Sequence, residues 1–123
     1  MATESFPGLL ETSREADSPR LSATKLAKAL DLQVQVLATI AGVHRNTLRT
    51  HPESPRLQAA LRDLMRVLSA AVEVQPDVNH AYFMVKNEPI PAFRHKTLLQ
   101  LVQEGRTDDA VDYLESINGG FVG

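Results

Sequence analysis

Apolar residues recur every three or four positions through most of this chain, which is the spacing of one face of an α-helix. The first such run, SATKLAKALDL, begins at Ser22, and a second, QVQVLATIA, follows at once and stops at Gly42. Ser22 suits an N-cap, and Gly42 can adopt the left-handed conformation that ends a helix. No segment alternates apolar and polar residues as a half-buried strand does, so the pattern predicts an all-α fold.

The longest apolar stripe predicts a helix over about 55–74, with Ser54 as its cap and a proline at its first position. Three shorter helices follow in the pattern. The first covers about 78–86 and is halted by NEPIPAF, whose prolines are expected to keep the next segment extended. The second, KTLLQLVQEG, ends at Gly105, and the third, TDDAVDYLESI, begins with Thr107 as its expected cap.

Composition divides the chain into three parts. Residues 1–20 mix Pro, Ser, Gly and Glu without a sustained period and are predicted to be a flexible arm. The helical periods predict a helix-turn-helix domain over 21–75, which the long helix joins to a small helical module over 76–123. A chain of 123 residues can bury enough surface for one compact domain, or for two small modules that share a core.

The absence of cysteine excludes disulfides, thiolate metal sites and cysteine nucleophiles. No apolar run approaches the roughly 18 residues of a membrane span, and the N-terminus lacks the pattern of a signal peptide, so we expect a cytoplasmic protein without membrane contact.

The net charge of −2 is unevenly distributed. Residues 1–19 carry one Arg against four acids, residues 20–56 carry six Lys and Arg against two acids, and residues 57–123 carry six against nine. A surface that binds a polyanion is therefore expected in the middle block, which also holds His44 and His51.

The strongest local motif is LATIAGVHRNTLR. Ala38 allows close helix approach, Gly42 supplies a left-handed turn, and Val43 and Leu48 anchor a second helix, expected over about 44–50, whose outer face is polar. In a helix-turn-helix this second helix enters the major groove of DNA. The candidate DNA-binding residues are His44, Arg45, Asn46, Thr47 (as a cap or phosphate donor) and Arg49, with phosphate contacts from Lys25 and Lys28. The alternative is a helical bundle with an ordinary solvated face.

Residues 21–123 resemble the Xre/MbcA/ParS-type antitoxins of bacterial type II toxin–antitoxin systems. The resemblance lies in LATIAGVHRNTLR, the long helix RLQAALRDLMRVLSAAVEV, and the order AYFMVKNEPIPAF, KTLLQLVQEG, AVDYLESI and NGGFVG. Phe83-Met84 stands where the family commonly has Trp-Leu, and RHKTL replaces the usual Gly-Arg-x-Pro.

This resemblance implies a protein that binds a toxin, often a RES-domain NAD-degrading or ADP-ribosylating enzyme, and covers its active site with the C-terminal module. It also implies an autorepressor that binds its own promoter DNA. We expect a homodimer within the toxin–antitoxin complex. A second hypothesis is a stand-alone helix-turn-helix regulator whose C-terminal helices mediate dimerisation.

The C-terminal INGGFVG is the first candidate toxin contact. Two glycines can end the helix sharply and direct an aromatic anchor into a cleft of a partner. The residues of this tail are Asn118, Gly119, Gly120, Phe121 and Val122. Alternatively, Phe121 folds back on Leu114 or Ile117 as a helix-end contact.

The second candidate contact is PAFRHKT, which displays Arg94, His95 and Lys96 at the start of a helix, where their charge opposes the helix dipole. This basic cluster could meet acidic groups of a toxin or phosphates of its nucleotide substrate, or it is a solvated loop.

An enzyme is not expected, and neither a cofactor nor a metal is. The four histidines show no i, i+4 pairing, and the chain has no glycine-rich phosphate loop or nucleophile elbow. Asp108, Asp109 and Asp112 are explained by their place near the start of the last helix.

Overall fold

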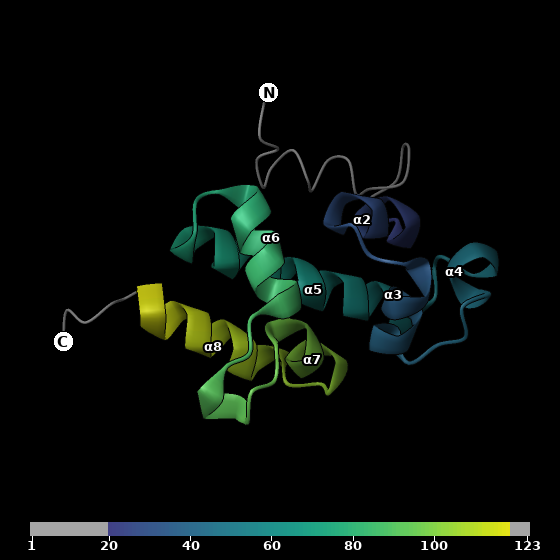
Figure 1. The fold of residues 1–123 in the computed structure, drawn as a ribbon. Coiled ribbons are helices and arrows are strands. Elements are labelled where there is room, and N and C mark those ends of the chain that lie inside the picture. Colours follow the sequence, from purple (N-terminus) through teal and green to yellow (C-terminus); the bar gives the residue numbers. More distant parts are fainter. Residues whose placement is uncertain (1–19, 119–123) are drawn as a thin grey trace.

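Seven α-helices and one short 3₁₀ helix make up residues 20–118, the part of the chain that the computed structural model describes (Figure 1). Within this part there is no strand, so the predicted all-α fold is confirmed; one isolated bridge pairs Ile90 with Lys96. None of these helices combines the length and apolar character needed to cross a membrane. The predicted arm lies outside the described residues except for Arg20.

The first three described helices are short. They are α2 (Ala23–Leu30), α3 (Val34–Ala41) and α4 (Thr47–Thr50). The hydroxyl of Ser22 caps α2 by accepting a hydrogen bond from the backbone N–H three residues later, at 3.2 Å. Gly42 ends α3 at φ 68°, as its position in the sequence predicts.

Helix α5 (Pro55–Val74) runs along the middle of the molecule and contacts helices from both halves of the chain (Figure 1). Its start is the predicted one, because the Ser54 hydroxyl accepts a hydrogen bond from the N–H of Leu57 at 3.4 Å and Pro55 occupies the first turn. The buried stripe of α5 consists of Leu57, Leu61, Leu64, Met65, Val67, Leu68 and Ala71.

The C-terminal half continues with α6 (Val78–Asn87), the 3₁₀ helix η1 (Pro91–Phe93), α7 (Leu98–Gln103) and α8 (Thr107–Asn118). Both α6 and α8 pack against α5, and α7 packs against both of them and against α3. The expectation of an extended segment after α6 is wrong in part, because Pro91 opens η1: its fixed φ also suits the first position of a helical turn.

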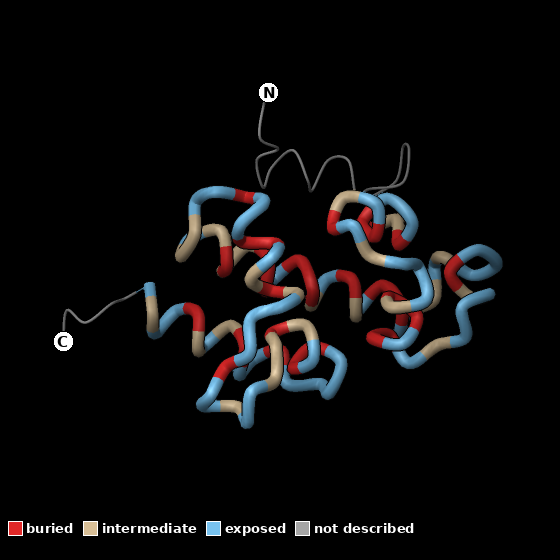
Figure 2. Tube along the Cα trace, in the orientation of Figure 1, coloured by how far each residue is buried: buried red, intermediate tan, exposed pale blue. Residues whose placement is uncertain are grey.

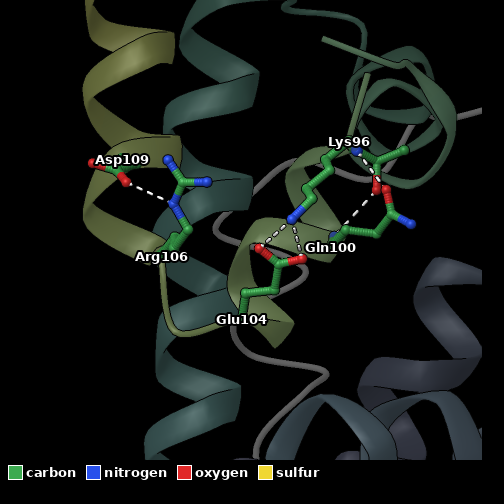
Figure 3. Close-up of polar contacts among 6 residues, drawn as sticks. Lys96, Gln100, Glu104, Arg106 and Asp109 are labelled. Carbon is green, nitrogen blue, oxygen red and sulfur yellow. Dashed lines mark hydrogen bonds and ion pairs between the residues drawn. The ribbon is translucent and has the colours of Figure 1, made fainter. Parts of the chain in front are cut away.

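The starts of α7 and α8 differ in how well they were predicted. Thr97 and Gln100 form a capping box at α7, with each side chain bonded to the backbone N–H of the other (Figure 3). Thr107 is not a cap, because it is already the first helical residue of α8, and its buried hydroxyl has no hydrogen-bond partner among residues 20–118.

The core is one cluster of apolar side chains shared by all of these α-helices (Figure 2). Two polar side chains tie the cluster together over long sequence separations. Lys86 of α6 donates to the carbonyl of Leu30 at the end of α2, at 2.7 Å, where its charge also matches the helix dipole. Gln58 of α5 bonds both backbone groups of Leu21, at 3.0 and 2.9 Å. The boundary proposed at 75/76 stays a prediction; it falls at the end of α5.

Candidate functional site

The predicted helix-turn-helix consists of α3, a glycine turn and α4. Gly42 adopts a left-handed conformation that residues with a Cβ disfavour, and the N–H of Val43 returns to the carbonyl of Ala38 at 3.0 Å. The Arg56 guanidinium, from the first turn of α5, donates to the Gly42 carbonyl at 3.2 Å. This bond joins the turn to the central helix, and no motif in the sequence indicated it.

Helix α4 begins later than predicted. The chain from His44 first makes tight turns, with the N–H of Thr47 bonded to the carbonyl of His44 at 2.8 Å and that of Leu48 to the carbonyl of Arg45 at 3.3 Å. Only from Thr47 does an α-helix follow, and it has four residues. The expected capping role of Thr47 is therefore wrong: Asn46 holds the N-cap position and already has helical dihedral angles.

The side chains of this segment divide as the motif predicts. Leu48 is buried, 7% exposed, and anchors α4, whereas Thr47 is half-buried. The remaining candidates are exposed: His44, Arg45, Asn46 and Arg49.

Two details fix which groups of this surface are available. Neither Arg45 nor Arg49 makes an ion pair or a side-chain hydrogen bond within residues 20–118. The backbone N–H of Asn46 donates to Nδ1 of His44 at 3.1 Å, so a neutral His44 ring carries its proton on Nε2. Among the described residues, the two guanidinium groups and Nε2 of His44 have no partner and are available to a ligand with base edges or phosphates.

Lys25 and Lys28 are exposed on α2, three residues apart and so on neighbouring positions of one helix face. Lys28 lies in the last turn of α2, where a positive charge is favoured by the dipole. Figure 1 places α2, α3 and α4 together at one end of the molecule. The two lysines thus extend the basic character of this end of the molecule beyond the turn.

A charged cluster that the sequence did not indicate lies before α5. Glu53 contacts His51 Nδ1 at 3.4 Å and Arg20 at 3.9 Å. A hydrogen bond from its own backbone N–H lowers the pKa of the Glu53 carboxyl, and His51 and Arg20 lower it further. The cluster borders an open hollow lined by Arg20, Glu53, Pro55, Gln58 and Arg62.

The second candidate surface is the turn between η1 and α7. Arg94 and His95 are exposed and have consecutive left-handed φ values of 57° and 66°. The N–H of Lys96 bonds to the carbonyl of Phe93 at 3.1 Å and closes the turn. The predicted basic cluster is divided, because the Lys96 ammonium is paired with Glu104 of the α7 C-cap at 2.6 Å (Figure 3).

An aromatic contact attaches this turn to α8. The ring of Phe93 meets Tyr113 of α8 edge to face, with centroids 5.9 Å apart, and the Arg106 guanidinium lies 5.2 Å from the Phe93 centroid. Arg106 is also bonded to Asp109 at 2.9 Å (Figure 3). The turn is therefore held to α8 by packing that the sequence motifs did not reveal.

The remaining toxin-binding candidates lie at the end of α8. Asn118 is exposed and is the last residue of that helix. Gly119, Gly120, Phe121 and Val122 lie outside the described residues, as does the alternative contact of Phe121 with Leu114 or Ile117. Phe83 of α6, 59% exposed, is a large apolar side chain on the surface of the same module.

Within residues 20–118 no cluster of histidines and carboxylates has the arrangement of a metal site. No family model, curated protein or solved structure matches the chain.

Proposed function

We propose that this protein is an antitoxin that binds and neutralises a cognate toxin and represses its own promoter. The observation that carries the proposal is the pairing of two exposed cationic surfaces on one helical core. One surface is the segment of His44, Arg45, Asn46 and Arg49 behind a left-handed glycine turn; the other is the Arg94–His95 turn of the C-terminal module.

The DNA-binding part of the proposal rests on exposure and anchoring. Arg45 and Arg49 are solvent-accessible, and the buried Leu48 between them fixes the short helix to the core. Arginine can pair with guanine edges or with phosphates, and asparagine with adenine, so these side chain types suit operator DNA. A homodimer would read two half-sites about one helical turn apart.

The toxin-binding part rests on the resemblance to Xre/MbcA/ParS-type antitoxins and on the geometry of the C-terminal module. In the sequence, GGFVG follows the last residue of α8, and the Arg94–His95 turn precedes α7 in the same module. We propose a RES-domain NAD-degrading or ADP-ribosylating enzyme as the toxin, with its active site covered by this module in the cytoplasm.

The experiment that tests this function is co-expression of the full chain with the product of the adjacent reading frame, compared with a chain that ends at Asn118. Cell growth and co-purification are scored. Rescue and co-purification by the full chain, with failure of the shortened chain, support an antitoxin whose tail contacts the toxin. A harmless neighbour that does not co-purify would contradict the proposal.

A second candidate is a stand-alone helix-turn-helix regulator that dimerises through its C-terminal helices. The exposed Phe83 on α6 favours it, because a large exposed aromatic side chain is common at interfaces between protein chains. The variant Phe83→Ser distinguishes the two. It should reduce dimer formation and operator affinity if α6 is a dimer contact, and it should leave both unchanged if the antitoxin function alone uses this module.

A further inference from the structure

The Arg94–His95 turn is the most strained backbone in the described part of the chain outside its glycines. Within residues 20–118, three residues with a Cβ have positive φ. Two of them are Arg94 and His95, and the third is Asp31, the C-cap of α2. The left-handed region is disfavoured for residues with a Cβ, and two consecutive residues in it form a turn that normally selects Asn-Gly. Arginine and histidine are poor local choices for this conformation.

The surrounding structure holds the turn in place. The carbonyl of Ile90 accepts hydrogen bonds from the N–H of Phe93 and of His95, both at 2.9 Å, and the N–H of Ile90 bonds to the carbonyl of Lys96 at 3.0 Å. Ile90 is itself buried, 3% exposed. Together with the packing of Phe93 against Tyr113, these hydrogen bonds fix the backbone conformation on both sides of Arg94 and His95. Strain that is held by its surroundings is typical of functional sites.

The charge of the turn is also unusual for its location. Residues 57–123 carry an excess of acids, and Lys96 and Arg106 are paired at 2.6 and 2.9 Å with Glu104 and Asp109 (Figure 3). Arg66, in the same part of the chain, is paired with Asp108 at 3.0 Å. Arg94 makes no ion pair or side-chain hydrogen bond within residues 20–118. The turn therefore presents the exposed guanidinium of Arg94 without a carboxylate partner among the described residues.

We infer that the Arg94–His95 turn is a preorganised docking element that pairs with carboxylates on the surface of a protein partner. Guanidinium binds carboxylate through two parallel hydrogen bonds, and a rigid turn loses little entropy on binding. The acidic side chains of α8 would repel DNA, so a protein surface with its own mixture of charges is the better match. This inference rests on the proposed function, since the toxin is the partner.

The test distinguishes the effect of backbone strain, measured as thermal stability, from the effect of the Arg94 charge, measured as affinity for the toxin. The double variant R94N/H95G gives the turn its preferred residues, so its midpoint temperature should rise by about 4–8 °C while its affinity for the toxin falls about 10- to 100-fold. Arg94→Gln keeps the strain and removes the charge, so it should lose affinity without gaining stability. Asp31→Gly is the matched control: it relieves a left-handed residue at φ 55° far from the turn, so it should gain stability and keep its affinity for the toxin.

The probe is the purified product of the adjacent reading frame, titrated at low and at high salt, with operator DNA as the second ligand. The inference is supported if R94N/H95G binds the toxin more weakly than the unchanged protein does, and if the toxin affinity of the variant changes less with salt concentration. Equal toxin affinity for R94N/H95G and the unchanged protein overturns the inference alone. A loss of DNA affinity instead overturns it in favour of a nucleic-acid contact. If the unchanged protein does not bind the toxin at all, the proposed function and the inference both fall.

Discussion

Gln58 offers a direct test of how the start of the helix-turn-helix is attached to the central helix. Its amide is buried, 7% exposed, and satisfies both backbone groups of Leu21, at 3.0 and 2.9 Å, and the carbonyl of Pro52, at 2.8 Å. The change Gln58→Leu keeps the size of the side chain and removes all three hydrogen bonds. Leu21 is 6% exposed, so its N–H and C=O would be left without a partner among residues 20–118.

The size of the effect follows from these two orphaned groups. A buried backbone donor or acceptor that loses its partner costs about 1–3 kcal/mol, and the half-buried Pro52 carbonyl can turn to water. The added apolar burial of leucine offsets part of this cost. We therefore expect the free energy of unfolding to fall by about 2–4 kcal/mol, a large part of the stability of a domain of this size.

The assay is urea unfolding followed by far-UV circular dichroism, with the midpoint and the slope fitted together. Gln103→Leu is the matched control, because Gln103 is exposed on α7; we expect that change to stay within about 0.5 kcal/mol. A loss below about 1 kcal/mol for Gln58→Leu at an unchanged slope would refute the reasoning, since it would mean that the Leu21 groups find other partners.

Three further predictions concern single side chains. Arg49→Ala should weaken operator binding by about 1–3 kcal/mol in a mobility-shift titration, whereas Arg66→Ala, on α5, should not. Because its pKa is lowered in the folded state, ionised Glu53 stabilises the fold above the unfolded value near 4.5 and stops doing so as pH falls through the lower folded value. The stability difference between Glu53→Gln and the unchanged protein, measured by urea unfolding across this range, should therefore disappear in acid. Thr107→Val replaces a buried hydroxyl that has no partner among residues 20–118 and should raise the free energy of unfolding by about 1 kcal/mol.

Helix boundaries were predictable where a single residue decides them. Ser22 and Ser54 accept from backbone N–H groups three residues later, and Gly42 and Gly105 have positive φ, because caps and left-handed glycines depend on local chemistry. The late start of α4 and the entry of Thr107 into α8 were not predictable. In both places more than one polar residue could cap, and tertiary contacts decide among them.

The candidate site was predictable as a list of side chains but not as an arrangement. The bond from Arg56 to Gly42 spans 14 positions, and that from Gln58 to Leu21 spans 37. Periodicity has no information on contacts of this range. The conformation of Arg94 and His95 was likewise missed, because intrinsic preference argues against it and tertiary contacts impose it: the closure between Ile90 and Lys96 and the packing of Phe93 on α8.

The two proposed surfaces are joined by one helix, and this determines which substitutions can separate them. Helix α5 carries Arg56 against the glycine turn and Arg66 against the start of α8, while α3 packs directly on α7. A cavity made in the shared core, for example at the fully buried Leu64, would weaken both surfaces together through the free energy of unfolding. Changes at exposed positions such as Arg49 and Arg94 leave that core intact. A loss confined to one activity is therefore evidence of direct contact, whereas a joint loss that follows stability is evidence of the scaffold alone.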